Sequence, residues 1–211
     1  AVSLAREAGA IARASFRSGV AKRFKDDGSF VTDVDERIND LVIERVNARF
    51  PTHDVYGEEG SDRSESEYVW VVDPIDGTNA FAHNVPTFVF SLALTRSGRP
   101  VLGVIYDPML DRLYVADELS DTELNGARIA VSDVDELEDA VAATGFPYTV
   151  RDKLDTVLGP MARVLATTQG LRRYGAASLD LAYVACGKLD FFYETDLKPW
   201  DTAAGWLLVE E

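Results

Sequence analysis

The segment from Tyr68 to Phe81 constrains the fold of this chain more than any other. Its apolar run, Val69 to Val72, is rich in β-branched and aromatic residues, which is typical of a buried strand. Pro74 has no N–H to donate to a sheet, so the strand is predicted to stop at that point. Gly77 to Phe81 predict a helix start, where free N–H groups and the positive dipole end favour an anion. The segment predicts a phosphate site at a strand end.

Two carboxylates, Asp73 and Asp76, stand at the same junction. A carboxylate repels a phosphate by about 1 kcal/mol per charge pair at contact distance in water, and by several times that in a partly buried site. Cations between the carboxylates and the phosphate would remove this repulsion. The junction is therefore predicted to be a metal and phosphate site.

Length and composition limit the class of protein. The 211 residues, 46% of them hydrophobic, are enough to bury one sizeable core or two smaller ones. The apolar stretches are too short to cross a bilayer, and no signal-peptide pattern opens the chain, so we expect a cytoplasmic protein without a membrane partner. Cys186 is the single cysteine, which excludes an internal disulfide.

The formal net charge of −15 argues against nucleic acid as a partner, because phosphate backbones need a basic surface. Asp and Glu total 36 residues against 21 Lys and Arg, and few of the basic residues are lysines. Such a surface suggests a halophile, since a high-salt cytoplasm would screen its self-repulsion.

Helical and strand patterns divide the chain near Asp139. Residues 1–139 are predicted to form an α+β domain with most of the metal ligands, and residues 140–211 an α/β domain with Asp201 and substrate-binding residues. The first part is predicted to contain helices at 2–18 and from Asp33 or Asp35 to 50, strands at 68–73, 87–96, 100–107 and 112–116, and a hairpin connection at 97–99. The second part is predicted to contain a strand from 141, helices at 152–167, 178–186 and from 201, and strands at 171–173 and 189–193.

Four separated segments carry chemistry. Two of them are ambiguous on their own, because residues 57–60 (Gly-Glu-Glu-Gly) also suit a solvated turn and Asp201 in residues 200–205 also suits a helix cap. The other two are the Asp73–Asp76 junction and the polar loop from Lys25 to Asp35. The spacing of Asp73 and Asp76 around Pro74 does not match an aspartyl-phosphate motif, and no nucleophile elbow, Walker A loop or paired-cysteine motif is present.

Together these segments resemble the inositol monophosphatase family, within the Mg²⁺-dependent, Li⁺-sensitive phosphatases, and specifically its archaeal inositol monophosphatase/fructose-1,6-bisphosphatase type. The resemblance rests on the Asp-Pro-Ile-Asp-Gly-Thr run, with Gly-Glu-Glu upstream and Trp-Asp-x-Ala-Ala-Gly downstream, and it covers nearly the whole chain. It implies a layered α-β-α-β-α sugar-phosphatase fold, a homodimer, and a second domain that is incomplete at the C-terminus, where the family continues.

The resemblance also implies roles for individual residues. The implied ligands of two or three Mg²⁺ ions are Glu58, Asp73, Ile75 through its carbonyl, Asp76 and Asp201. The implied catalytic residues, which orient and activate the attacking water, are Glu58, Thr78 and Asp35. The implied substrate-binding residues are Asp76, Gly77, Thr78, Gly175, Ala177, Glu194 and Asp201. Lys25 is placed on the loop beside the metal site, and Glu59 is expected to point away from it.

The expected function is a Mg²⁺-dependent phosphomonoesterase acting on a small polyol or sugar phosphate, inositol 1-phosphate or fructose 1,6-bisphosphate. Carboxylates that share two or three Mg²⁺ ions leave coordination positions for water and phosphate, so no covalent nucleophile is needed. A phosphatase acting on 3′-phosphoadenosine 5′-phosphate or another nucleotide is the enzymatic alternative. A degenerate, cation-binding regulatory relative is the non-enzymatic one.

Overall fold

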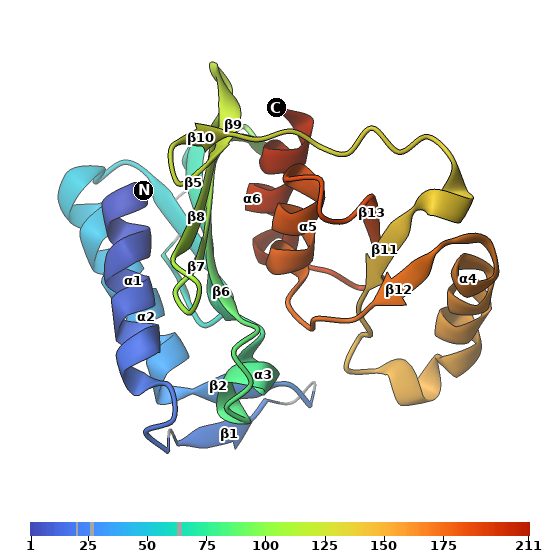
Figure 1. The fold of residues 1–211 in the computed structure, drawn as a ribbon. Helices are drawn as coiled ribbons and strands as arrows, with labels where there is room; N and C mark the ends of the chain where they lie inside the picture. The colour runs from blue at the N-terminus through green and yellow to red at the C-terminus, as the bar shows by residue number, and fades with distance from the viewer. Residues whose placement is uncertain (20, 26–27, 63–64) are drawn as a thin grey trace.

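The computed structural model describes residues 1–19, 21–25, 28–62 and 65–211 (Figure 1). In chain order its elements are α1 (Val2–Ser15), β1 (Lys22–Phe24), β2 (Phe30–Thr32), α2 (Asp33–Arg49), β3 (Asp54–Gly57), β4 (Ser61–Asp62), β5 (Tyr68–Asp76), α3 (Thr78–Ala82), β6 (Val89–Arg96), β7 (Arg99–Asp107), β8 (Arg112–Asp117), β9 (Ser120–Leu124), β10 (Ala127–Arg128), η1 (Leu137–Asp139), β11 (Val141–Thr144), η2 (Val150–Asp152), α4 (Leu154–Thr167), β12 (Gly170–Arg172), α5 (Ala177–Ala185), β13 (Phe191–Tyr193) and α6 (Pro199–Glu210).

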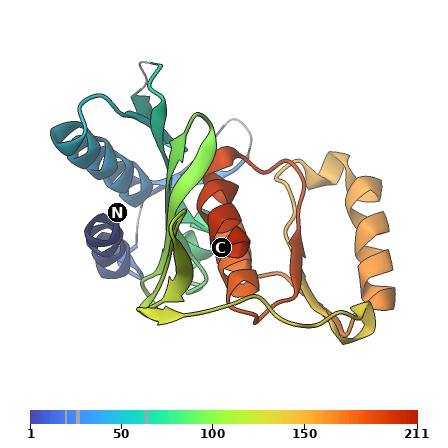
Figure 2. The same ribbon diagram turned by 90° about the horizontal axis from the view of Figure 1, so that it is seen from above.

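Helices and sheets alternate in layers. Figure 1 shows α1 and α2 on one face of the large sheet and α5 and α6 on its other face, followed by the small sheet and then α4. Figure 2, which looks along the molecule from above, shows the same succession. The predicted layered α-β-α-β-α architecture is confirmed.

The two sheets differ in strand direction. The eight-stranded sheet has the order β10-β9-β8-β7-β6-β5-β3-β4, and its pairs are antiparallel except β3 with β5. Its centre is a meander from β5 to β8, with Ser97 and Gly98 connecting β6 to β7 as predicted. The three-stranded sheet, β12-β11-β13, is entirely parallel, because α4 and α5 return the chain between its strands.

The core fills both faces of the large sheet. On one face, Ile38 and Val42 of α2 pack with Phe90 and Leu92 of β6. On the other face, a second cluster joins the sheet to α5 and α6, with Leu179, Leu207 and Leu208 fully buried. These clusters hold β5 in the centre of the molecule, which fixes the position of the junction that follows it.

Several boundaries differ from the sequence-based expectation. β5 does not stop at Pro74 but continues to Asp76, with a shift of register against β6 between Asp73 and Asp76, where Pro74 provides no N–H. The last helix begins at Pro199, whose fixed φ suits the first helical turn, and not at Asp201. The expected pattern also missed the short strands β1 to β4, β9 and β10.

The described residues include no helix that combines the length and apolar character needed to span a bilayer. The division of the chain near Asp139 stays a prediction.

Candidate active site

The end of β5 places the first three predicted site residues close together. Asp73 and Asp76 are buried, and Ile75 is fully buried between them. The Ile75 N–H donates to Asp73 Oδ1 at 3.1 Å, which fixes the orientation of that carboxylate. The following helix, α3, has five residues, and Gly77 is its N-cap, in agreement with the helix start predicted at Gly77 to Phe81.

Thr78 connects this junction to α2. Its hydroxyl lies 2.8 Å from the Ile75 carbonyl oxygen and 3.2 Å from Asp35 Oδ1, and can donate to one of these acceptors at a time. The other Asp35 oxygen accepts from the N–H of Thr32 at 2.9 Å and from its hydroxyl, as the capping box of α2. Asp35 and Thr78, both predicted to handle the attacking water, are thus in contact. Burial raises the pKa of Asp35 to about 6, so its carboxylate can accept a proton near neutrality.

Glu58 follows β3 in the turn beside β5, where its N–H donates to the Val72 carbonyl oxygen at 3.2 Å. Its Oε1 accepts from Lys25 Nζ at 2.7 Å, and the same ammonium donates to Glu59 Oε1 at 2.5 Å. The turn thus brings both carboxylates to one lysine, and the expectation that Glu59 points away from the metal site stays a prediction. Lys25 therefore places a positive charge in direct contact with Glu58, one of the predicted metal ligands.

Asp76 and Asp201, the remaining predicted ligands, lie at the starts of two helices: Asp76, from the end of β5, caps α5, and Asp201 belongs to α6. Asp76 accepts from the N–H of Ala177 at 3.2 Å and from the N–H of Ser178, so it caps α5 from a distant part of the chain. Asp201 accepts from the N–H of Lys198 at 2.6 Å in the first turn of α6. The Ser178 hydroxyl donates to the Asp201 carbonyl oxygen at 3.1 Å, which joins the two helices.

The turn with Gly175 and Ala177 lies beside Gly77. A Cβ built on Gly77 would lie 3.2 Å from the Ala176 Cβ, so Gly77 and the turn are in direct contact. In Figure 1, α3 and the segment that enters α5 lie at the same end of the molecule. Glu194 follows β13. Its pKa is raised to about 7, first by burial and then by the negative charge of Asp201, so Glu194 interacts electrostatically with the predicted metal ligands.

The clustered carboxylates suit a cation site. Burial and then the charges of Glu58, Asp76 and Asp201 raise the pKa of Asp73 well above its usual range. Burial also raises the pKa of Asp76 to about 6 and that of Asp201 to about 7, with neighbouring carboxylates adding to both. In all three cases burial is the main cause and neighbouring carboxylates add to it, so divalent cations bound among these carboxylates would stabilise their ionised forms.

Among the residues that the structure describes, no three His, Cys, Asp or Glu side chains are arranged so that they already hold a metal ion. The oxygen-only donor set nevertheless fits Mg²⁺, which keeps several waters and needs only one or two carboxylates per ion.

Two residues near the site were missed by the sequence patterns. Asp180 is 1% exposed, and its raised pKa of about 8 comes from burial and then from Asp76 and Glu194. The signal was a lone acid between Leu179 and Leu181, on an otherwise apolar helix. Arg173 carries no motif that marks it, and only the fold brings it near Glu194.

The sequence model of the inositol monophosphatase family matches residues 1–211. The chain belongs to the inositol monophosphatase family. It is 36% identical over 215 residues to the Nus factor SuhB of Escherichia coli K12, an alignment that covers 100% of this chain and 80% of that protein. It is 39% identical over 189 residues to the inositol-1-monophosphatase of Rhizobium meliloti, with 89% of this chain and 71% of the relative covered.

Solved structures give the same result. The extragenic suppressor protein suhB from Bartonella henselae superimposes with a TM-score of 0.94 at 36% identity, covering 100% of this chain and 82% of the other. The inositol monophosphatase of Anabaena sp. PCC 7120 gives a TM-score of 0.89 at 35% identity, over 99% of this chain and 78% of the other. The chain is therefore a phosphatase, of a metal-dependent family. Its archaeal subtype stays a prediction.

Proposed function

We propose that this chain is a Mg²⁺-dependent phosphomonoesterase that hydrolyses a small polyol or sugar phosphate, with inositol 1-phosphate as the first substrate to test. The supporting observation is the gathering of Glu58, Asp76 and Asp201 around the buried Asp73, whose pKa is raised first by burial and then by the charges of those three carboxylates. A buried group of this kind is costly in a protein that does not use it.

The proposed Mg²⁺ ligands are these four carboxylates and the Ile75 carbonyl oxygen. When bound, the ions would neutralise the carboxylates, acidify a water molecule and stabilise the leaving oxygen. Asp35 and Thr78 are held in contact at 3.2 Å, so they can orient that water and take its proton. The turn from Gly175 to Ala177 and the carboxylate of Glu194 would hold substrate hydroxyl groups.

The test is phosphate release by the purified chain from inositol 1-phosphate, fructose 1,6-bisphosphate and 3′-phosphoadenosine 5′-phosphate, with Mg²⁺ and with EDTA. Hydrolysis of a sugar or polyol ester that requires Mg²⁺ would support the proposal. Faster hydrolysis of 3′-phosphoadenosine 5′-phosphate would show that the substrate is a nucleotide and not a sugar or polyol phosphate. Release from none of the three would favour the regulatory alternative, to which the relatives named as Nus factors give some weight.

A further inference from the structure

The turn that carries Glu58 is held by a buried side chain from α2. Glu58 and Glu59 lie between the end of β3 and the start of β4. Across this turn the N–H of Gly57 donates to the Gly60 carbonyl oxygen at 3.1 Å. The Asn39 Nδ2 donates to the same carbonyl oxygen at 3.2 Å. A single acceptor at the end of the turn therefore joins the two strands to α2.

The two glycines that flank the glutamates leave room for the Asn39 amide. A Cβ built on Gly57 would lie 2.1 Å from Asn39 Oδ1, so no side chain fits at Gly57 unless the turn or Asn39 moves. A Cβ built on Gly60 would lie 3.2 Å from Asn39 Nδ2, which is also a tight contact. The amide is thus packed against the backbone on both sides of the two glutamates, and a displacement of the amide would displace the turn.

The Asn39 amide costs free energy that an apolar side chain would not cost. Asn39 is 2% exposed, and among the residues that the structure describes no donor reaches its Oδ1. Burial of an amide oxygen without a hydrogen bond is unfavourable, so a buried group of this kind calls for an explanation. The contact between Nδ2 and the turn supplies one, because only a donor can hold the Gly60 carbonyl oxygen.

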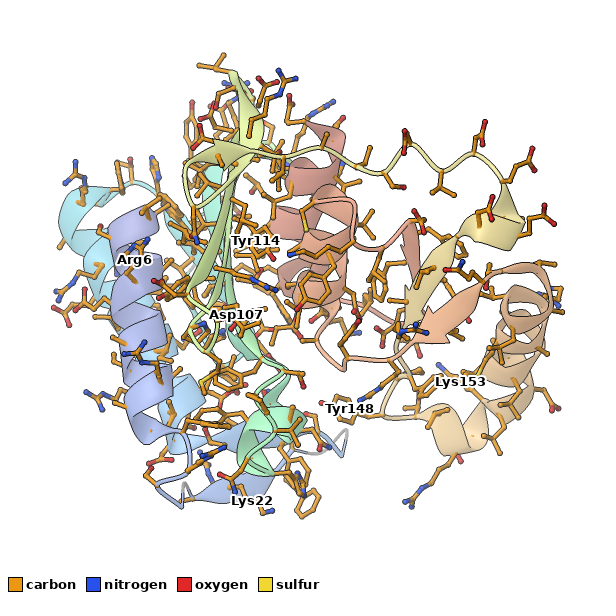
Figure 3. All side chains as sticks on the ribbon, viewed as in Figure 1. Arg6, Lys22, Asp107, Tyr114, Tyr148 and Lys153 are labelled. Atoms are coloured by element: carbon orange, nitrogen blue, oxygen red, sulfur yellow. The ribbon has the colours of Figure 1, made fainter. Side chains whose placement is uncertain are left out.

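Asn39 shares its face of α2 with Asp35. The other buried residues of this helix are apolar, and the two polar ones are four residues apart, which places them on the same side. Asp35 contacts Thr78 at 3.2 Å, whereas Asn39 contacts the turn. In Figure 3, Lys22 marks β1, whose partner strand β2 leads directly into α2. One face of α2 therefore contacts both the residue proposed to orient water and the turn with a proposed metal ligand.

We propose that Asn39 is a positioning residue, which holds the turn from Gly57 to Gly60 so that the Glu58 carboxylate is directed to the Mg²⁺ site. This inference rests on the proposed function and adds a residue that acts on one ligand through the backbone. Residues that orient a metal ligand without touching the metal typically contribute about 10-fold to 100-fold to metal affinity. Loss of the amide should therefore weaken cation binding.

The test compares the wild type with Asn39→Leu, which has a similar branched shape, and Asn39→Ala, which is smaller; both lack the donor. Val42→Ala is the control, because Val42 is a fully buried core residue of the same helix, and its truncation destabilises the fold without removing a hydrogen bond to the turn. Binding of Mn²⁺, a spectroscopic substitute for Mg²⁺, would be measured by electron paramagnetic resonance. The melting temperature in EDTA and kcat at saturating Mg²⁺ complete the set.

Both Asn39 variants should bind Mn²⁺ about 10-fold to 100-fold more weakly than the wild type, with kcat at saturating Mg²⁺ changed by about twofold or less. Val42→Ala should lower the melting temperature and leave the Mn²⁺ affinity unchanged. In a Glu58→Gln protein, the addition of Asn39→Leu should weaken Mn²⁺ binding no further, because the amide acts through Glu58.

Four results would overturn the inference alone: unchanged Mn²⁺ affinity in both Asn39 variants, an equal loss of affinity in Val42→Ala, an additive effect with Glu58→Gln, or failure of both Asn39 variants to fold. The last result would show that the amide serves the whole fold and not the turn. A wild type that binds no Mn²⁺, or that hydrolyses none of the three phosphate esters, would overturn the proposed function whatever the Asn39 variants do.

Discussion

Replacing Asp180 with Asn should make the metal-free protein more stable, because the wild-type carboxyl is buried without support. Asp180 lies in the first turn of α5, is 1% exposed, and neither of its oxygens has a hydrogen-bond partner among the described residues. Burial, and then the charges of Asp76 and Glu194, raise its pKa from the ordinary 3.8 to about 8. Asn has nearly the same shape and removes the titrating group.

The sign of the effect follows from proton binding. A carboxyl whose pKa is raised by folding binds its proton more tightly in the folded state, so its contribution is fully favourable only below about pH 4. Above that pH the unfolded chain ionises while the folded group stays protonated, and stability falls by about 1.4 kcal/mol per pH unit. The loss is on the order of 4 kcal/mol at pH 7 and levels off above the folded pKa of about 8.

The assay is urea unfolding of the wild type and Asp180→Asn at several pH values from 5 to 8, in EDTA so that bound cations do not lower the carboxyl pKa. The variant should gain stability relative to the wild type as pH rises, and its melting temperature should increase by about 2–4 °C for each kcal/mol. Asp155→Asn, in the exposed first turn of α4, is the matched control and should show no such pH dependence. A stability difference that is constant with pH, or a variant less stable than the wild type throughout, would refute the reasoning.

Three other perturbations test the site and the surface. Glu58→Gln should reduce kcat/KM at saturating Mg²⁺ far more than Glu59→Gln. The reason is that the charge of Glu58 raises the pKa of Asp73, whereas Glu59 accepts a hydrogen bond from Lys25. The reverse order of effects would show that Glu59 is the metal ligand. Asp73→Asn should abolish most activity yet raise the melting temperature in EDTA, since it removes a buried carboxylate with a raised pKa, and a lower melting temperature there would contradict this. If the net charge of −15 reflects a halophile, the melting temperature should climb steadily with KCl to molar concentrations, and a flat response would exclude that origin.

The strongest sequence signals were those in which one local pattern had one physical meaning. The apolar run before Asp73 predicted a central strand, and Ser97 with Gly98 predicted the hairpin between β6 and β7. The alternation of strands and helices after Val141 predicted α/β layer packing, and the small sheet has that form, with parallel strands. The strands β1 to β4, β9 and β10 have between two and five residues, too few to show a period of two.

Contacts between distant segments were beyond the sequence patterns. The ammonium of Lys25 reaches both Glu58 and Glu59 only because the hairpin of β1 and β2 lies beside the turn after β3, a matter of packing. Arg173 likewise has no local signal, because its partner Phe146 is brought to it by the pairing of β11 with β12 in the small sheet. The periodicity of a sequence indicates on which face of a helix or strand a residue lies, but it does not indicate which distant segment packs against that face.

The candidate site is formed by residues from both sides of the predicted boundary near Asp139. Asp76 belongs to the large sheet, but the N–H groups that stabilise its ionised form belong to Ala177 and Ser178. Those N–H groups lower the Asp76 pKa against the effect of burial, so a fragment that ended near Asp139 would lose both this support and Asp201. Even if the two parts fold separately, the carboxylate group forms only when α5 and α6 pack against β5. The proposed roles of Glu194 in substrate binding and of Asp73 in metal binding therefore depend on the same packing, and a change that loosens it should weaken both.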